Sequence, residues 1–180
     1  MRTPNPQHIA RLSDVINSSP YFELISMKIR EIGIGYSFFE IDLNKKHLQP
    51  FGLAHGGVFA ALVDTAASWA LFYGIEDQHA GLTSVDLKLN YLAPAVSGKL
   101  IAKGRLIKMG KTLGYAEAHV TDETGKILAH GTSTIMVLQG KAPAADPPFP
   151  PKFIEKPTEE AWLPIEGSRS IRDETLQLRP

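Results

Sequence analysis

One carboxylate, Asp64, lies in the otherwise apolar or small-residue stretch GLAHGGVFAALVDTAASWALF, residues 52–72. An ionised carboxylate in apolar surroundings is costly unless it is paired or hydrogen-bonded. Two explanations follow from this placement. Either the charge reaches water at a helix surface and is satisfied by a hydroxyl such as that of Thr65 or Ser68, or the protein uses it in its chemistry.

The motif His55-Gly56-Gly57 lies where the helix that carries Asp64 is predicted to begin. Two glycines leave the first backbone N–H groups uncovered, and these groups have no partner inside the helix. Together with the helix dipole they favour negative charge, such as a carbonyl oxygen that becomes an oxyanion. Glycines also let a strand and a helix pack closely, so the motif alone leaves both roles open.

The spacing of the two features predicts a dimer. Asp64 follows Gly56 by eight residues, which is about 12 Å along a helix axis. One chain therefore cannot bring the N–H group and the carboxylate to the same carbonyl. Two chains can, if their helices run antiparallel across a two-fold axis. We expect a homodimer with two equivalent sites, each built from both subunits.

A central helix and a sheet must position these groups. Apolar spacing predicts a short amphipathic helix over 5–17 and a long apolar helix over 56–73. Alternating patterns predict strands over 27–43 (one strand, or a hairpin bent near Gly33 and Gly35), 82–92, 99–110, 112–123 and 126–138. Short turns make the last three strands antiparallel neighbours. A helix that is apolar nearly all round must be wrapped, so the predicted fold class is α+β, a curved antiparallel sheet around one long central helix.

The strand predicted over 82–92 alternates regularly. Val85, Leu87, Leu89 and Tyr91 fall on one face, and Ser84, Asp86, Lys88 and Asn90 fall on the other.

The amino-acid composition changes after residue 140. This change predicts one domain over 1–140 and a Pro-rich tail over 141–180. Eight of the 13 prolines and only one glycine fall in the last 40 residues, and KAPAADPPFPPKF is expected not to sustain a strand ladder. One interpretation is a semi-rigid or disordered tail. The other is an ordered arm that docks on a partner subunit through its apolar residues: Phe149, Phe153, Ile154, Trp162, Leu163 and Ile165.

The composition excludes several classes of protein. Lys plus Arg and Asp plus Glu are balanced at 19 each, so no excess charge draws the chain to nucleic acid or anionic lipid. There are no cysteines, and the six histidines show no metal-ligand spacing. We expect no metal and no cofactor. The N-terminus lacks an apolar core of signal-peptide length and the stretch 52–72 is interrupted by Gly, His and Asp, so we expect a cytoplasmic protein without a membrane span.

Two blocks of sequence resemble a known family. The stretch QPFGLAHGGVFAALVDTAASWAL and the later segments VDLKLNYLAPA, GKT and AHGTSTIM are similar to hotdog-fold acyl-CoA thioesterases of the 4-hydroxybenzoyl-CoA thioesterase superfamily. The similarity is greatest to the PaaI-like branch, named for phenylacetyl-CoA thioesterase. It covers about Ser19 to Leu138 and implies a hotdog fold that hydrolyses an acyl-CoA to the free acid and coenzyme A.

The resemblance implies roles for five residues. Asp64 fills the position of the catalytic carboxylate, as nucleophile or as general base on water. Gly56 supplies the N–H group that polarises the thioester carbonyl. Gln49 orients the carbonyl or the water, Ser84 helps to place the water, and His55 either shapes the start of the helix or binds near the carbonyl.

The sequence signal for residues that bind coenzyme A is less specific than the signal for the five residues above. Its phosphates need cations and backbone donors, which makes Lys108, Lys111 and Thr112 around the KMGKT turn candidates. Gly57 is a further candidate for substrate binding, because it lies beside Gly56, the predicted oxyanion donor. Asn90 and Tyr91 are candidates for the pantetheine channel, although Tyr91 also fits the core.

The sequence leaves several matters open. A non-catalytic acyl-CoA-binding module or scaffold and a hotdog dehydratase are alternatives to the thioesterase. The carrier is coenzyme A or acyl carrier protein, and the expected assembly of dimers into a homotetramer has no predicted arrangement. The acyl group is not identified, because an aromatic-acyl or a fatty-acyl pocket could use the same aromatic residues: Phe51, Phe59, Trp69, Phe72 and Tyr73.

Overall fold

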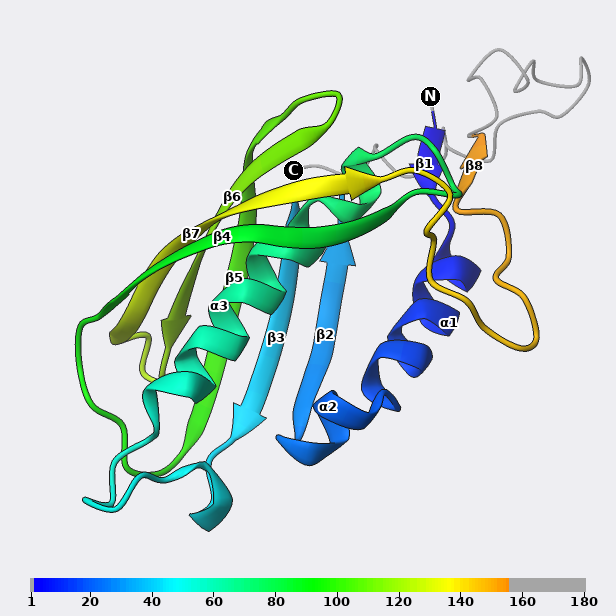
Figure 1. Cartoon of the computed structure of the whole chain (residues 1–180). Coiled ribbons are helices and arrows are strands. Elements are labelled where there is room, and N and C mark those ends of the chain that lie inside the picture. The colour runs from blue at the N-terminus through cyan, green and yellow to red at the C-terminus, as the bar shows by residue number, and fades with distance from the viewer. Residues whose placement is uncertain (1, 156–180) are drawn as a thin grey trace, which may run out of the picture.

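The computed structural model describes residues 2–155. A six-stranded antiparallel sheet curves around helix α3 (Gly56–Ala70), as Figure 1 shows. The strand order is β2-β3-β5-β6-β7-β4. The strands are β2 (Met27–Gly33), β3 (Tyr36–Asp42), β4 (Gly81–Tyr91), β5 (Lys99–Met109), β6 (Leu113–Thr121) and β7 (Ile127–Leu138). This arrangement confirms the predicted α+β class and the wrapped central helix.

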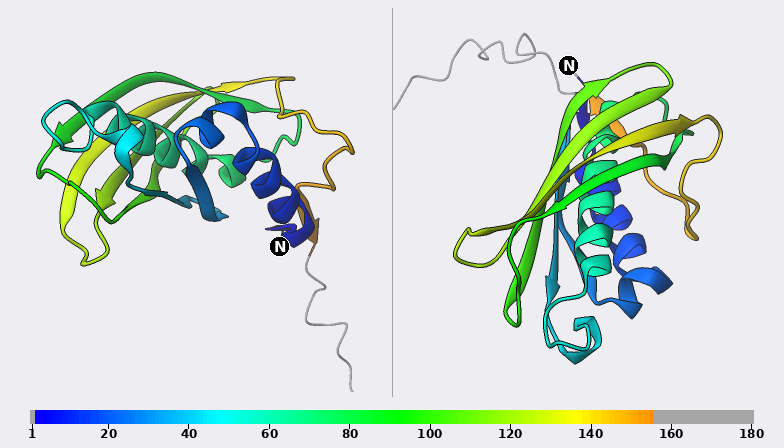
Figure 2. Two further views of the ribbon diagram at one scale, coloured as in Figure 1. Left: turned by 90° about the horizontal axis from the view of Figure 1, so that it is seen from below. Right: turned by 60° about the vertical axis from the view of Figure 1, so that its left-hand side comes forward.

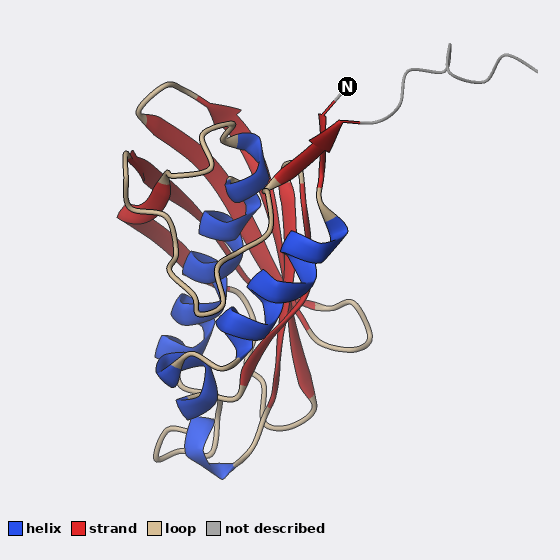
Figure 3. Ribbon diagram, turned by 90° about the vertical axis from the view of Figure 1, so that its right-hand side faces the viewer, coloured by secondary structure: helices blue, strands red, loops and turns tan. Residues whose placement is uncertain are grey.

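Shorter elements flank this body. Helices α1 (Pro6–Asn17) and α2 (Pro20–Leu24) precede the sheet, and 3₁₀ turns form over Lys45–His47 and Phe72–Gly74. Helices α1 and α3 lie on the same side of the sheet (Figure 3). The segment 27–43 is a hairpin, because Gly35 has a φ of 82° and turns the chain between β2 and β3.

Helix α3 packs very closely against the sheet. Its core residues Leu62, Val63, Ala66 and Ala67 are fully buried. A Cβ atom on Gly104 of β5 would lie 2.0 Å from the carbonyl oxygen of Ala66, so only glycine fits there. The same oxygen accepts a hydrogen bond of 2.7 Å from Ser37 Oγ on β3. These contacts fix the depth and rotation of the helix on which Asp64 lies.

The strand β4 departs from the predicted alternation. A β-bulge at Val85 interrupts the pairing of β4 with β7 between Ser84 and Asp86, and Val85 is 55 % exposed. The prediction that Val85 shares a face with Leu87 was therefore wrong. An extra residue in a strand reverses the sides of the residues beyond it. The bulge thereby places Ser84 on the same face as Leu87, the face that packs against α3.

The first part of the predicted tail packs on its own chain. Strand β8 (Phe153–Glu155) pairs with β1 (Arg2–Pro4). The expectation that KAPAADPPFPPKF forms no ladder holds over residues 141–152, where no strand forms, and was wrong only at Phe153. Asn5 binds the neighbouring backbone, because its N–H donates to the carbonyl of Lys152 at 3.0 Å and its Nδ2 donates to that of Pro151 at 2.8 Å. Figure 2 shows the segment leaving the sheet and running beside α1 to the N-terminus.

Two of the residues predicted to dock on a partner pack within the chain instead. Phe149 and Phe153 lie against its hydrophobic core, whereas Ile154 is exposed. The other residues of that prediction, Trp162, Leu163 and Ile165, lie outside the described residues.

The side chain of Lys152 is buried among aromatic rings. It is 2 % exposed, its Nζ donates to the carbonyl of Ile75 at 2.9 Å, and Nζ lies 4.0 Å from the ring centroid of Phe72. Burial lowers the pKa of Lys152 to about 8. Burial and the nearby Lys152 charge also lower the pKa of His8.

We expect the stability of the protein to rise between about pH 8 and pH 10, relative to a Lys152→Met variant. In this range the unfolded chain still holds the proton on Lys152, with its ordinary pKa of 10.5, while the folded chain has released it. The unfolded state then binds more protons, so the free energy of unfolding increases with pH. Thermal melts of both proteins across this range measure the effect. A constant difference in Tm between them would contradict it.

Candidate functional site

Asp64 is held in place by a short chain of hydroxyl groups. Ser84 Oγ donates a hydrogen bond of 2.6 Å to Asp64 Oδ1. Ser68 Oγ lies 3.0 Å from Ser84 Oγ and, because the hydroxyl hydrogen of Ser84 is engaged with Asp64, Ser68 acts as the donor to Ser84. The neighbouring hydroxyl that satisfies Asp64 is thus on β4, at the position oriented by the bulge.

The half-buried carboxylate of Asp64 opens on a cavity of about 380 Å³, which we call the Asp64 cavity. The hydroxyl of Ser84 binds the carboxylate, and the apolar residues Trp69 and Phe72 line the cavity farther along the chain. The lining residues are Asp64, Thr65, Ser68, Trp69, Phe72, Gly81, Leu82, Thr83, Ser84, Lys141 and Pro143.

The start of α3 offers an unpartnered backbone donor. His55 caps the helix, and its Nδ1 accepts a hydrogen bond of 2.9 Å from the N–H of Gly57. The N–H of Gly57 is therefore engaged. The N–H of Gly56 has no acceptor among residues 2–155, which is what an oxyanion donor requires. Because Nδ1 of His55 is an acceptor, the proton of a neutral imidazole lies on Nε2.

Gly56 opens on a second cavity of about 350 Å³, which we call the Gly56 cavity. Gln49 lines it, and Gln49 Oε1 accepts a 2.6 Å hydrogen bond from the N–H of Phe51. This bond fixes which end of the amide is oxygen and leaves the amide nitrogen as a donor for a ligand. The lining residues are Gln49, Leu53, Ala54, Gly56, Phe59, Tyr91, Leu92, Ala93 and Pro94.

Tyr91 covers the start of α3 rather than filling the core. It is 60 % exposed, its hydroxyl donates to the carbonyl of Gly56 at 3.3 Å, and its ring packs edge-on against Phe59. A Cβ atom on Gly56 would lie 3.1 Å from the ring of Tyr91. Glycine at 56 therefore leaves room for the aromatic ring beside the exposed N–H group.

No described residue lines both cavities. The carboxylate and the backbone donor thus open on two separate cavities of one chain, in keeping with their spacing along the helix. The structure brings together Asp64 with Ser84, and Gly56 with Gln49, His55 and Tyr91.

Other predicted residues lie apart from both cavities. Lys108 is at the end of β5, and Lys111 and Thr112 are in the turn before β6. These three line neither cavity in the described chain. Asn90 is exposed on β4, and strand alternation directs it away from the face of Tyr91.

The five aromatic residues considered for the acyl pocket lie in different parts of the structure. Trp69 and Phe72 line the Asp64 cavity, Phe59 lines the Gly56 cavity, Phe51 is exposed and Tyr73 is buried.

Sequence reasoning missed the support that Ser68 gives to Ser84 and the contribution of the C-terminal segment. The position of Ser68 was detectable, because it lies one helical turn after Asp64. Lys141 and Pro143 carried no such signal, because a Pro-rich sequence does not indicate where it folds back.

We expect Ser84→Ala to lower kcat about tenfold and to change KM little, because Ser84 fixes the orientation of Asp64 without supplying charge. Initial rates with a saturating substrate measure this effect. Thr132→Ala, on the neighbouring strand β7 at a residue that lines neither cavity, is the matched control and is expected to remain near wild-type. A Ser84→Ala enzyme with full kcat would show that the 2.6 Å hydrogen bond has no role in turnover.

Comparisons with known proteins agree on one family. The model of the thioesterase superfamily matches residues 51–129. A 1,4-dihydroxy-2-naphthoyl-CoA hydrolase of Listeria monocytogenes is 32 % identical over 115 residues, which cover 64 % of this chain and 93 % of the relative. Acyl-coenzyme A thioesterase 13 of Mus musculus is 29 % identical over 132 residues, covering 71 % of this chain and 93 % of that protein.

A solved structure supports the same fold. The crystal structure of a thioesterase from Haemophilus influenzae superimposes with a TM-score of 0.69 at 24 % sequence identity, covering 77 % of this chain and 96 % of that chain. Gly56, Asp64, Ser84 and Tyr91 all fall within the residues matched by the family model.

Proposed function

The chain belongs to the thioesterase superfamily and has the hotdog fold, and from this we propose that it hydrolyses an acyl-CoA thioester to the free acid and coenzyme A at a dimer interface. One relative is named a CoA hydrolase and another an acyl-coenzyme A thioesterase. The observation that carries the proposal is the pair of half-sites: a hydrogen-bonded carboxylate in one cavity and an unpartnered helix N–H group in another.

The exposed edge of the sheet supports a shared site. β4 is an edge strand of the six-stranded sheet, and Val85 and Tyr91 on it expose apolar surface. Such an edge can pair with another chain. Pairing of two copies through β4 about a two-fold axis would lay the two α3 helices antiparallel, with Gly56 of one copy facing Asp64 of the other. Further association of two dimers into a tetramer is compatible with this use of β4.

The chemistry needs no cofactor. A thioester carbonyl is electrophilic and its thiolate is a good leaving group, so one carboxylate with oxyanion donors suffices. Asp64 attacks the carbonyl carbon, or removes a proton from a water molecule that attacks it. The negative charge that develops on the carbonyl oxygen is bound by the N–H of Gly56 and the amide nitrogen of Gln49 from the partner subunit. Collapse of the intermediate expels the thiolate of coenzyme A. After attack by water this step leaves the free acid; after attack by Asp64 it leaves a mixed anhydride, which a water molecule then hydrolyses to the free acid and the carboxylate of Asp64.

Release of free thiol from a panel of acyl-CoAs tests the proposal. The chain contains no cysteine, so a thiol reagent reports only the coenzyme A that is released. We expect thiol release with at least one acyl-CoA, in proportion to enzyme. Saturable binding of acyl-CoAs without release of thiol from any of them would instead support a binding module.

A further inference from the structure

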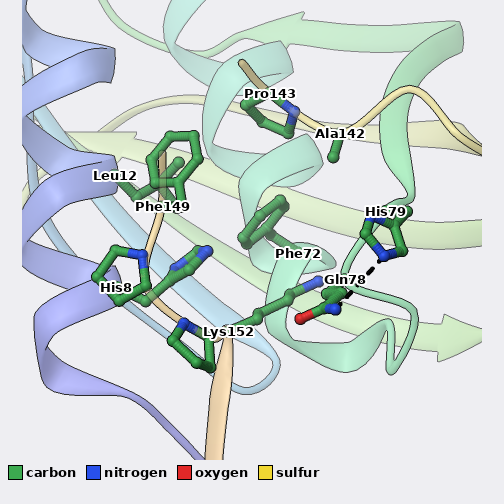
Figure 4. Close-up of a pocket in the computed structure, with 11 residues that line it drawn as sticks. His8, Leu12, Phe72, Gln78, His79, Ala142, Pro143, Phe149 and Lys152 are labelled. Atoms are coloured by element: carbon green, nitrogen blue, oxygen red, sulfur yellow. Dashed lines mark hydrogen bonds between the residues drawn. The ribbon is translucent and has the colours of Figure 1, made fainter. Parts of the chain in front are cut away.

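A further cavity lies directly behind the Asp64 cavity. It has a volume of about 310 Å³ and is bounded by α1, the end of α3, the loop at His79 and the segment 142–152, as Figure 4 shows. We call it the distal cavity. Two residues, Phe72 and Pro143, line both this cavity and the Asp64 cavity. The ring of Phe72 therefore forms part of the wall between two adjoining spaces.

The ring of Phe72 is held firmly in this position. It is 4 % exposed, and its centroid lies 5.2 Å from that of Trp69 and 6.0 Å from that of His8. Lys152 Nζ lies 4.0 Å from the ring centroid and is itself fixed by the carbonyl of Ile75. Because aromatic and cationic partners contact several sides of the ring, moving it aside disrupts several packed contacts at once.

The Asp64 cavity becomes apolar toward this wall. On the α3 side, the polar residues Asp64 and Ser68 are followed along the chain by the apolar Trp69 and Phe72, while Thr83 and Lys141 add polar groups elsewhere in the lining. Phe72 follows Asp64 by eight residues, which corresponds to about 12 Å along the helix direction. An acyl group that leaves the carboxylate along this apolar lining meets the ring of Phe72.

We propose that Phe72 ends the acyl pocket and determines the preferred length of the acyl group. On this proposal the enzyme selects short- and medium-chain acyl groups, and the ring closes the distal cavity to the substrate. The inference rests on the proposed thioesterase function and adds the substrate class to it. The segment 141–152, which lies outside the residues matched by the family model, supplies the outer wall through Pro143.

The test compares full-length wild-type and Phe72→Ala enzymes on a series of saturated acyl-CoAs from butanoyl to hexadecanoyl. We expect kcat/KM of the wild-type to be highest for a short or medium chain and to fall for longer ones. Removing the ring joins the two cavities. The ratio of kcat/KM for the longest chain to that for the shortest should then rise at least about tenfold, because each added methylene gains apolar contact.

Phe149→Ala is the matched control. It deletes the same ring from the opposite wall of the distal cavity, where Phe149 packs 5.2 Å from His8. Phe72 stays in place in this variant, so we expect an unchanged chain-length profile. Combined with Phe72→Ala, the same deletion should extend the preferred chain further. A shift in the profile with Phe149→Ala alone would overturn the role of Phe72 as the end of the pocket.

Phe72→Leu tests the proposal if the alanine variant fails to fold, because leucine keeps the core apolar and is smaller than the ring. The expected shift in the chain-length profile is smaller than for Phe72→Ala and in the same direction. If wild-type is active and the Phe72 variant that folds keeps its profile, the inference fails alone. If wild-type releases no thiol from any acyl-CoA, the proposed function fails and the inference fails with it.

Discussion

Asp64→Asn is expected to lower kcat at least about a thousandfold, while the oligomeric state and Tm stay unchanged. The amide oxygen of asparagine can still accept the hydrogen bond that Ser84 gives to Asp64 at 2.6 Å. The shape of the site is therefore preserved, and only the negative charge is lost. A neutral amide neither attacks a thioester nor removes a proton from water.

Initial rates of thiol release, thermal melts and gel filtration check this result together. Asp42→Asn is the matched control, because it makes the same change on a side chain that is 75 % exposed at the end of β3. This control is expected to keep wild-type kcat. An Asp64→Asn enzyme that retained more than about a tenth of the wild-type kcat would contradict a role of Asp64 as nucleophile or general base.

The second expected result is recovery of activity from two inactive chains. A Gly56→Val chain should be inactive as a homodimer, because a Cβ at 56 would lie 3.1 Å from the ring of Tyr91 and the added methyl groups crowd the exposed N–H. An Asp64→Asn homodimer should also be inactive. In a heterodimer of the two, one site carries both changes and the other carries neither, so about half of the wild-type activity should return.

Two different affinity tags allow the heterodimer to be purified before its kcat is measured. The control pairs the Asp64→Asn chain with a chain that carries both substitutions. This heterodimer has no carboxylate at position 64 in either subunit and should stay inactive. If the first heterodimer also stayed inactive, a site shared between subunits would be excluded, and a site within one chain would need another oxyanion donor near Asp64.

The central helix and the separation of Gly56 from Asp64 could be predicted from the sequence, because both follow from local rules. Apolar residues on nearly every side of a helix require burial, and the eight-residue interval between Gly56 and Asp64 fixes their separation through the helical rise. Pairing of β5, β6 and β7 followed from their short turns.

Other features depended on tertiary contacts that the sequence does not encode locally. The bulge at Val85 leaves no mark in the alternation of β4, yet it reverses the side on which Ser84 lies. The return of residues 141–155 onto α1 was equally hidden. It depends on single contacts such as that of Asn5 with Lys152, whose partners are far apart in the chain.

On the proposed role of Phe72 and Pro143, the pairing of β1 with β8 links substrate choice to the strand Arg2–Pro4. Arg2–Pro4 and Asn5 contact the C-terminal end of the segment 141–155, which includes Pro143 and Lys152. Deletion of residues 2–4 would remove the partner strand of β8 without touching Asp64 or Gly56. Such a protein should still hydrolyse thioesters but discriminate less between acyl groups, and the same series of acyl-CoAs measures this loss of discrimination.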